Sequence, residues 1–483
     1  RVILVISSAF AFGFWSEVFA ESFGCPKPYS SPNPMSVKSF AKTYGGTMED
    51  YGFSVQQTSD GGYIVAGITG SFVAESADIF LLKTDANGNI IWAKTYGGTY
   101  WDEAYSVQQT SDGGYIVAGG TRSFGAGNSD VFLLKTDANG NIQWAKTYGR
   151  TSDDGASSVQ QTSDGGYIVA GGTRSFGAGG DIFLIKTDAN GNIQWAKTYG
   201  GTGWDEAYSV QQTSDGGYIV AGFTESFGAG SYDLFLIKTD ANGNVQWAKT
   251  YGETNREFAY SVQQTSDGGY IVVGRTASFG AGSYDLFLIK TDASGNIIWA
   301  KTFGGTYSDD AYSVQQTSDG GYIVAGLKNF FGVGKIFLIK TDANGNIIWA
   351  KTYERTGWDE AYSVQQTSDG GYIVAGYTRS SGAGDDIFFI KTDANGNIGS
   401  CSIVRSVSPT VTTPSPTVTT PSPSVSSVSP TVNSVSPTVT SPTLTVSEPC
   451  PLSISESYQI ISGIITPYKG GIKVRGSGEF EVK

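Results

Sequence analysis

Short apolar runs that end in polar turns repeat along most of this chain. One unit spans Ala93–Trp144, and within it Asp112-Gly113 and Asn139-Gly140 each separate two apolar-rich runs. Aspartate or asparagine followed by glycine favours a tight hairpin turn, because these residues tolerate the positive φ angles that such turns require. The unit therefore predicts four short antiparallel strands: Tyr105–Thr110, Tyr115–Thr121, Val131–Thr136 and Ile142–Tyr148.

The same unit occurs seven times. The motif Ala-Lys-Thr followed by Tyr or Phe recurs every 50 to 52 residues, at Ala41, Ala93, Ala145, Ala196, Ala248, Ala300 and Ala350. No window shows the 3.6-residue period of a helical repeat. Four antiparallel strands in a unit of about 50 residues are typical of a propeller blade. We therefore predict an all-β fold, a seven-bladed β-propeller with four-stranded antiparallel blades.

The last unit predicts how the ring of blades closes. After Thr392 the seventh copy lacks the usual fourth strand. Val37–Tyr44, near the start of the chain, has the sequence of that strand, with Phe40 in place of the usual tryptophan. We expect this N-terminal strand to complete the last blade, so that the propeller spans residues 37–400.

A tryptophan begins the fourth strand in six units, at Trp92, Trp144, Trp195, Trp247, Trp299 and Trp349. Each lies seven residues after an aspartate and four after a glycine, a spacing that resembles the tryptophan-docking motif of quinoprotein-type propellers. The resemblance implies that each indole packs between neighbouring blades. The whole repeat, with its QTSDGGYIVAG and KTDANGNIxW segments, resembles that of secreted and cell-surface β-propeller proteins of archaea and bacteria. This resemblance implies architecture and location, and says nearly nothing of activity.

Four segments flank the propeller. Residues 1–20 are apolar after Arg1 and are expected to be a signal peptide or an N-terminal hydrophobic segment, with a retained membrane anchor as the alternative. Residues 21–36 form a linker. Residues 401–449 are rich in Ser, Thr and Pro, which favours an extended polyproline-II stalk. Residues 450–483 are expected to be a small β segment, too short to be stable alone.

The three cysteines are consistent with export, because disulfides persist outside the cell. Cys25 and Cys401 flank the predicted ring closure and could form a disulfide across it. A Cys401–Cys450 bond and a free thiol are the alternatives. We expect a secreted or cell-surface protein with no transmembrane span in the mature chain.

Charge and composition argue against several classes of function. The formal net charge of −13, with no basic stripe, argues against a nucleic-acid partner. Histidine is absent, which removes the commonest general base and the commonest transition-metal ligand. The blades present the same groups seven times, so no constellation is singled out for catalysis. We therefore predict neither enzymatic activity nor a cofactor, apart from a possible calcium ion.

The variation between units is concentrated in two loops. The loop before the first strand and the loop after the second strand differ from blade to blade, and blade geometry places both on one face of the ring. Aromatic and arginine side chains are the types that anchor interfaces. The predicted interaction residues are Trp101, Trp204, Trp358, Arg122, Arg174 and Arg379. Drift in weakly constrained loops is the alternative explanation.

One column of the repeat is acidic in all seven copies: Asp50, Asp102, Asp154, Asp205, Glu257, Asp309 and Asp359. We expect these carboxylates to surround one mouth of the central channel, where oxygen ligands could attract a hard cation such as calcium. Alternatively, each one caps its own turn through backbone N–H groups, which is the commoner role.

Two functions follow from these features. The first is a non-enzymatic binding or adhesion module, held away from the cell by the stalk and contacting a protein or glycan with its variable face. The second is a structural subunit of a surface layer or extracellular filament, which would self-associate by β-strand addition through the C-terminal β segment.

Overall fold

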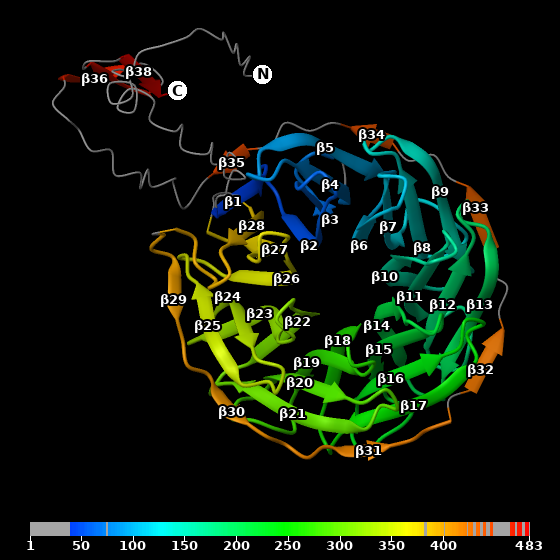
Figure 1. The fold of residues 1–483 in the computed structure, drawn as a ribbon. Coiled ribbons are helices and arrows are strands. Elements are labelled where there is room, and N and C mark those ends of the chain that lie inside the picture. Colours follow the sequence, from blue (N-terminus) through cyan, green and yellow to red (C-terminus); the bar gives the residue numbers. More distant parts are fainter. Residues whose placement is uncertain are drawn as a thin grey trace, which may run out of the picture. The chain divides into compact units, whose positions relative to one another are not determined.

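The computed structural model describes residues 39–422 except 74–75, 381–383 and 400, and beyond residue 422 it describes only the backbone of short strands. Seven antiparallel sheets are arranged around a central channel, as Figure 1 shows. This confirms the predicted seven-bladed propeller. In the part of the chain that the structure describes, no helix is long and apolar enough to span a membrane.

Each blade runs from the channel outward in chain order (Figure 1). The first strands, next to the channel, are β2 (Asp50–Gln57), β6 (Asp102–Gln109), β10 (Asp154–Gln161), β14 (Asp205–Gln212), β18 (Glu257–Gln264), β22 (Asp309–Gln316) and β26 (Asp359–Gln366). The second strands are β3 (Tyr63–Thr69), β7 (Tyr115–Thr121), β11 (Tyr167–Thr173), β15 (Tyr218–Thr224), β19 (Tyr270–Thr276), β23 (Tyr322–Phe330) and β27 (Tyr372–Thr378). The third strands are β4 (Asp78–Thr84), β8 (Asp130–Thr136), β12 (Asp181–Thr187), β16 (Asp233–Thr239), β20 (Asp285–Thr291), β24 (Val333–Thr341) and β28 (Asp386–Thr392). The fourth strands are β5 (Ile90–Gly97), β9 (Ile142–Gly149), β13 (Ile193–Gly200), β17 (Val245–Gly252), β21 (Ile297–Gly304), β25 (Ile347–Tyr353) and β1 (Phe40–Gly45). We number the blades 1 to 7 from β2.

The ring closes as predicted. Strand β1 pairs antiparallel with β28, with Phe40 opposite Lys391, and so supplies the fourth strand of blade 7. Cys401 is disulfide-bonded. Its two possible partners, Cys25 and Cys450, lie outside the described residues, so the choice between them stays a prediction, as does residues 1–20 being a signal peptide.

The hydrophobic core lies between the blades, at the seven seams where neighbouring sheets face each other. The tryptophans contribute to these seams as expected. The Trp195 ring packs edge-on against Tyr218 of the next blade, with ring centroids 5.9 Å apart. The Trp92 indole N–H donates to the Ala138 carbonyl oxygen of the following blade at 3.3 Å.

A buried tyrosine on each of six fourth strands adds a hydrogen bond across its seam. The Tyr199 hydroxyl, for example, donates to the Gly243 carbonyl oxygen at 2.7 Å. We expect Tyr199→Phe to lower the free energy of unfolding by about 1–2 kcal/mol, because it leaves that carbonyl unpaired. Tyr63 is the matched control: it is equally buried, yet its hydroxyl has no hydrogen-bond partner among the described residues. Tyr63→Phe should therefore cost nothing in urea denaturation, and an equal loss for both variants would refute this assignment.

The Ser/Thr/Pro-rich segment differs from the predicted stalk, because it adds a fifth strand to every blade (Figure 1). We call these seven strands the belt: β29 (Val404–Ser406), β30 (Thr410–Thr412), β31 (Thr417–Thr419), β32 (Ser424–Ser427), β33 (Thr431–Ser434), β34 (Thr438–Thr440) and β35 (Thr445–Ser447). They run backwards around the ring, from β25 of blade 6 to β1 of blade 7. The outer edge of each fourth strand offers unpaired N–H and C=O groups, and pairing with them outweighs the polyproline-II preference of the segment.

The belt has one heptad for each blade. Valine recurs every seven residues, at Val404, Val411, Val418, Val425, Val432, Val439 and Val446. Each of these valines is in register with the tyrosine or phenylalanine that precedes the end of a fourth strand, such as Tyr251 opposite Val418. The prolines all fall between the belt strands, where a missing N–H costs no ladder hydrogen bond.

The last described strands, β36 (Ile464–Tyr468), β37 (Gly471–Arg475) and β38 (Glu479–Val482), pair with one another in a small antiparallel sheet. The expectation that residues 450–483 form a small β segment stays a prediction.

Candidate functional site

Seven side chains converge on the channel from the fourth position of each first strand. The pairing of first and second strands skips this position, as between Ala104 and Ser106. Such a β-bulge redirects the side chain of the extra residue. Six of the seven are aromatic, and we call them the aromatic collar: Phe53, Tyr105, Tyr208, Tyr260, Tyr312 and Tyr362.

The aromatic collar is interrupted at blade 3. Neighbouring rings touch around the rest of the channel, with centroids 5.0 to 5.2 Å apart from Tyr105 through Phe53 round to Tyr208. Blade 3 has Ser157 at this position, and two residues earlier Gly155 replaces the larger side chains of the other blades. A solvent-open cavity of about 600 Å³ lies at the channel mouth, lined by the aromatic collar and, at blade 3, by Gly155 and Ser157.

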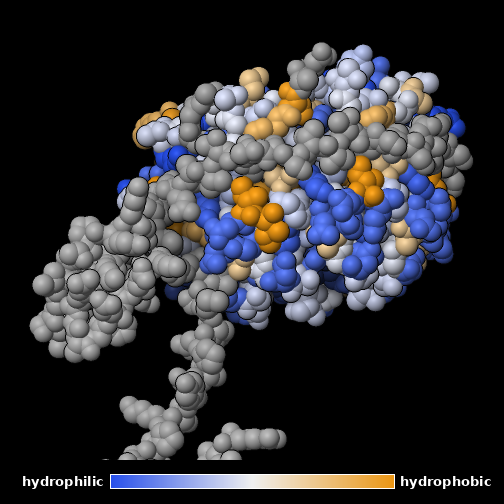
Figure 2. Space-filling model, turned by 90° about the horizontal axis from the view of Figure 1, so that it is seen from above, coloured by the Kyte–Doolittle hydropathy of each residue, from blue (hydrophilic) through white to orange (hydrophobic). Residues whose placement is uncertain are grey.

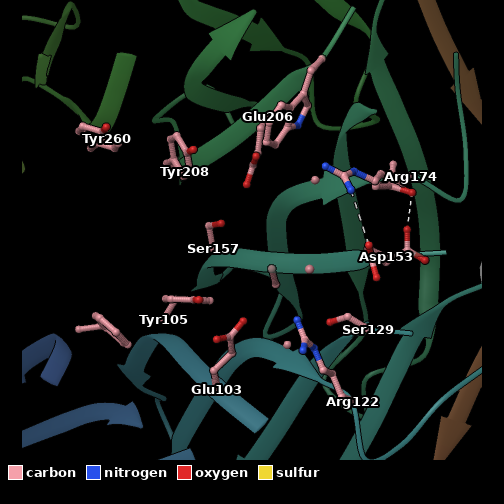
Figure 3. A pocket seen from close by; sticks show the side chains of 18 of the residues that line it. Glu103, Tyr105, Arg122, Ser129, Asp153, Ser157, Arg174, Glu206, Tyr208 and Tyr260 are labelled. Carbon is pink, nitrogen blue, oxygen red and sulfur yellow. Dashed lines mark hydrogen bonds and ion pairs between the residues drawn. The ribbon is translucent and has the colours of Figure 1, made fainter. Parts of the chain in front are cut away.

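Charged side chains surround this cavity. Figure 3 shows the carboxylates of Glu103 and Glu206 on opposite sides of Ser157, with Arg122 and Arg174 further from the channel. Arg174 is held in place, since its guanidinium lies 3.7 Å from the Asp153 carboxylate and 5.3 Å from the centre of the Trp204 ring.

The two glutamates differ in their partners. The Trp101 indole N–H donates to Glu103 at 2.9 Å. Among the described residues, no hydrogen bond or ion pair reaches the Glu206 carboxylate. Burial raises the pKa of Glu206 to about 7, although the nearby Arg174 opposes the shift. The cavity therefore contains a carboxylate with no direct hydrogen bond or ion pair among the described residues.

The structure brings together only some of the predicted interaction residues. Trp204, Arg122 and Arg174 line the cavity, and Trp101 supports it through Glu103. The other two predicted residues, Trp358 and Arg379, do not line it. The Trp358 indole is half-buried and donates to Glu360 at 3.2 Å, while Arg379 pairs with Asp385 at 3.2 Å.

The conserved acidic column of the repeat does not encircle the mouth as expected, because its side chains are buried in the seams. Asp50, Asp102, Asp154, Asp205, Glu257, Asp309 and Asp359 are each at most 1% exposed. Asp102 accepts hydrogen bonds from the Thr121 hydroxyl, the Ser123 hydroxyl at 2.7 Å and the Gly98 N–H at 2.8 Å. This is the turn-capping role, which holds the loop before each first strand.

A second buried acid faces this column at most seams. Asp78 lies beside Asp102, and burial followed by the charge of Asp102 raises the pKa of Asp78 to about 7. Blade 6 has Lys335 at the equivalent position, 3.6 Å from Asp359. Within the described residues no group of three or more acidic, cysteine or histidine side chains is arranged to hold a metal. Calcium binding by the acidic column stays a prediction.

Sequence reasoning missed the cavity itself, although its signal is present. The segment Asp154-Gly155-Ala156-Ser157 stands where blades 2, 4 and 7 have Asp-Glu-Ala-Tyr. This difference lies inside a strand, whereas the sequence comparison between blades considered only the variable loops.

Comparisons with known proteins add little to this description. No protein-family model matches the chain. Over 219 residues it is 26% identical to the regulatory protein FlaEY of Caulobacter vibrioides, an alignment that covers 41% of this chain and 21% of FlaEY. The chain therefore spans about a fifth of the length of that relative.

Among solved structures, the chain is similar to Sqt1 of Chaetomium thermophilum, at 13% identity and a TM-score of 0.43 over 76% of this chain and 88% of Sqt1. It is also similar to Sqt1 bound to the N-terminus of the ribosomal protein L10, at 14% identity and a TM-score of 0.41 over 69% and 84% of the two chains. A protein of unknown function from Dyadobacter fermentans follows at 12% identity and a TM-score of 0.39, over 72% and 97%. These likenesses assign neither activity nor partner.

Proposed function

We propose that this chain is a non-enzymatic binding module, acting at the cell surface, that holds a partner protein at the blade 3 cavity. The interruption of the aromatic collar at Ser157 carries this proposal. Six blades present touching aromatic rings at the mouth, and blade 3 interrupts them beside Trp204, Arg122 and Arg174. Aromatic and arginine side chains around a recess are typical of interface hot spots.

Two features support the other parts of the proposal. The disulfide at Cys401 favours an oxidising compartment outside the cell. The Ser157 hydroxyl has no hydrogen-bonded base among the described residues, which favours binding over nucleophilic catalysis.

The alternative of a self-assembling structural subunit receives less support. Strand addition at the outer edges would have to occur beyond the belt, whose strands have only three or four residues. Short edges interrupted by proline resist such pairing. On the side of the propeller seen in Figure 2, hydrophobic residues form separate small groups among hydrophilic ones.

The test is capture of envelope and secreted proteins by the immobilised full chain. We expect Trp204→Ala to weaken the binding of the captured partner by about thirtyfold, as for a hot spot of about 2 kcal/mol. Trp358→Ala is the control, because Trp358 lies outside the cavity. A partner that binds both variants equally, or one that is lost when its glycans are removed, would refute a protein-binding cavity at blade 3.

A further inference from the structure

Blade 5 contains a side chain that blade 3 lacks. Arg275, the sixth residue of β19, reaches into the seam between blades 5 and 6. Its guanidinium lies 3.3 Å from the Asp310 carboxylate of the next blade. It also lies 4.8 Å from the centre of the Phe258 ring and 4.5 Å from that of Tyr284. The channel mouth of this propeller can therefore hold a guanidinium between a carboxylate and aromatic rings.

The equivalent seam between blades 3 and 4 has the carboxylate without the arginine, and Gly155 and Gly180 stand where blade 5 has the rings of Phe258 and Tyr284. Gly172 is the sixth residue of β11 and corresponds to Arg275, while Glu206 is the second residue of β14 and corresponds to Asp310. The two positions adjoin each other, since a Cβ added to Gly172 would lie 3.2 Å from Cγ of Glu206. Because Gly172 has no side chain, Glu206 faces the cavity instead of an arginine.

The charges around the cavity also favour a cation. Three accessible carboxylates line it, from Glu103, Asp153 and Glu206, against the two guanidiniums of Arg122 and Arg174, while the fourth acid, Asp154, is buried. Arg174 is already paired with Asp153. Burial raises the pKa of Glu206 to about 7, although the charge of Arg174 opposes the shift. Tyr208 and Tyr105 add ring surface on either side, which suits a planar cation.

We propose that the blade 3 cavity binds the guanidinium of an arginine side chain that a partner protein presents, with Glu206 as its carboxylate. The proposal rests on the proposed binding function and names the chemistry that the cavity recognises. The partner's arginine would occupy the place that Arg275 fills within this chain at blade 5. A bidentate carboxylate–guanidinium pair gives both affinity and orientation.

In the first experiment the full chain is titrated with a tripeptide that has arginine at its centre and blocked termini. Binding is measured from the changes in NMR chemical shifts. The same peptide with citrulline, which is neutral and of nearly the same shape, should bind at least tenfold more weakly. Glu206→Gln should weaken the arginine peptide by at least tenfold. Glu360→Gln is the control, because Glu360 occupies the position of Glu206 in blade 7 and its carboxylate already accepts hydrogen bonds from Trp358 and Tyr377. This variant should bind the arginine peptide as tightly as the native chain does. Equal binding of the two peptides, or no effect of Glu206→Gln, would overturn the proposal.

A second experiment supplies the cation from within the chain. Gly172→Arg should raise the melting temperature at pH 8 and abolish peptide binding, and the gain should disappear in the Gly172→Arg, Glu206→Gln double variant. Gly172→Leu is the control, since Leu327 occupies the equivalent position in blade 6. A gain as large for leucine as for arginine would show that the cavity does not select a cation.

The two proposals can fail separately. If the captured partner is lost with Trp204→Ala but kept with Glu206→Gln, the binding function stands and recognition of arginine is refuted. If neither variant affects capture, both are refuted.

Discussion

Removing the belt is expected to lower the melting temperature by about 10 °C and to turn the monomer into multimers. The comparison is between a chain that ends after Ser408 and one that ends after Glu448. Both lack residues 450–483, so they differ only in belt strands β30 to β35 and the residues between and after them. In a propeller of this size, such a shift in melting temperature corresponds to a loss of several kcal/mol in the free energy of unfolding.

The expected loss comes from the sum of many weak contacts. Each belt strand is short, and each backbone hydrogen bond contributes only about 1 kcal/mol. Side chains add to the pairing, since the Thr419 and Thr412 hydroxyls lie 2.6 Å from those of Thr250 and Thr302. Because three or four residues connect successive belt strands, docking one strand raises the effective concentration of the next.

Multimers are expected because the shortened chain exposes six outer edges with nearly identical sequences. Unpaired edge strands are templates for pairing with another chain. Differential scanning calorimetry and light scattering provide the two measurements. If the two chains melt together and both stay monomeric, the belt does not contribute to the folded state in solution.

The second large effect is a loss of stability as the pH rises from about 4 to 8. The buried acids Asp78, Asp181 and Asp233 cause this loss of stability. Burial and a neighbouring carboxylate raise their pKa values to about 7, about 6 and about 6. A carboxyl group with a raised pKa binds its proton more tightly in the folded state than in the unfolded chain. Its stabilising contribution is therefore present at low pH and is lost as the pH passes from its unfolded pKa through its folded pKa.

Other carboxylates limit the stability of the fold at low pH. Burial alone would raise the pKa of Asp112, but hydrogen bonds from Thr110 and Lys135 outweigh it and hold the pKa at about 2. Asp164, Asp215, Asp267 and Asp319 behave alike. These groups lose their contribution to stability as the pH falls below about 4, so we expect the greatest stability near pH 4.

Asp78→Asn tests the pH prediction directly. It should raise the free energy of unfolding at pH 8 by about 2–4 kcal/mol, since a pKa difference of one unit is worth about 1.4 kcal/mol. At pH 4, close to the unfolded pKa, it should have little effect, because Asp78 then keeps its proton in the folded state and largely in the unfolded chain as well. Asp102→Asn is the control: it replaces one of the two oxygens that accept from Thr121 and Ser123 with an NH2 donor, and it should destabilise the protein at both pH values.

Repeating the same experiment with added calcium tests whether the paired acids bind a cation. Stabilisation at pH 8 by added calcium in the native chain, but not in Asp78→Asn, would support a cation between the paired acids. If wild type and Asp78→Asn show the same pH dependence without calcium, the raised pKa of Asp78 is refuted.

The sequence was sufficient to predict the blades because their signals are local. Hairpin turns such as Asp137–Asn141 fix strand ends within a few residues, and seven copies make the period plain. Even the ring closure could be read, since Val37–Tyr44 repeats the sequence of a fourth strand. The first strands begin about three residues earlier than predicted, at Asp102 rather than Tyr105, because the acidic residue caps the loop before it and also joins the ladder.

The belt shows where local reasoning was insufficient. Prolines in residues 401–449 indicate an extended chain, and in isolation nothing there provides a core. The seven-residue spacing of valines was visible, but its meaning depends on seven outer edges that exist only once the ring has formed. The pairing of β31 with β17 joins residues more than 160 positions apart in the sequence.

The sequence by itself determined the four strands of each blade, the number of blades, the closure of the ring and the face on which the blades vary, because hairpin turns and side-chain alternation act between near neighbours. Only the tertiary structure decided that the acidic column is buried, that the Ser/Thr/Pro segment is a belt, and that Ser157 and Gly155 line a cavity in front of Glu206. Each of these depends on how neighbouring blades face each other. The physical reason is that burial, pKa and pairing at a seam are set by two strands that the chain brings together only on folding.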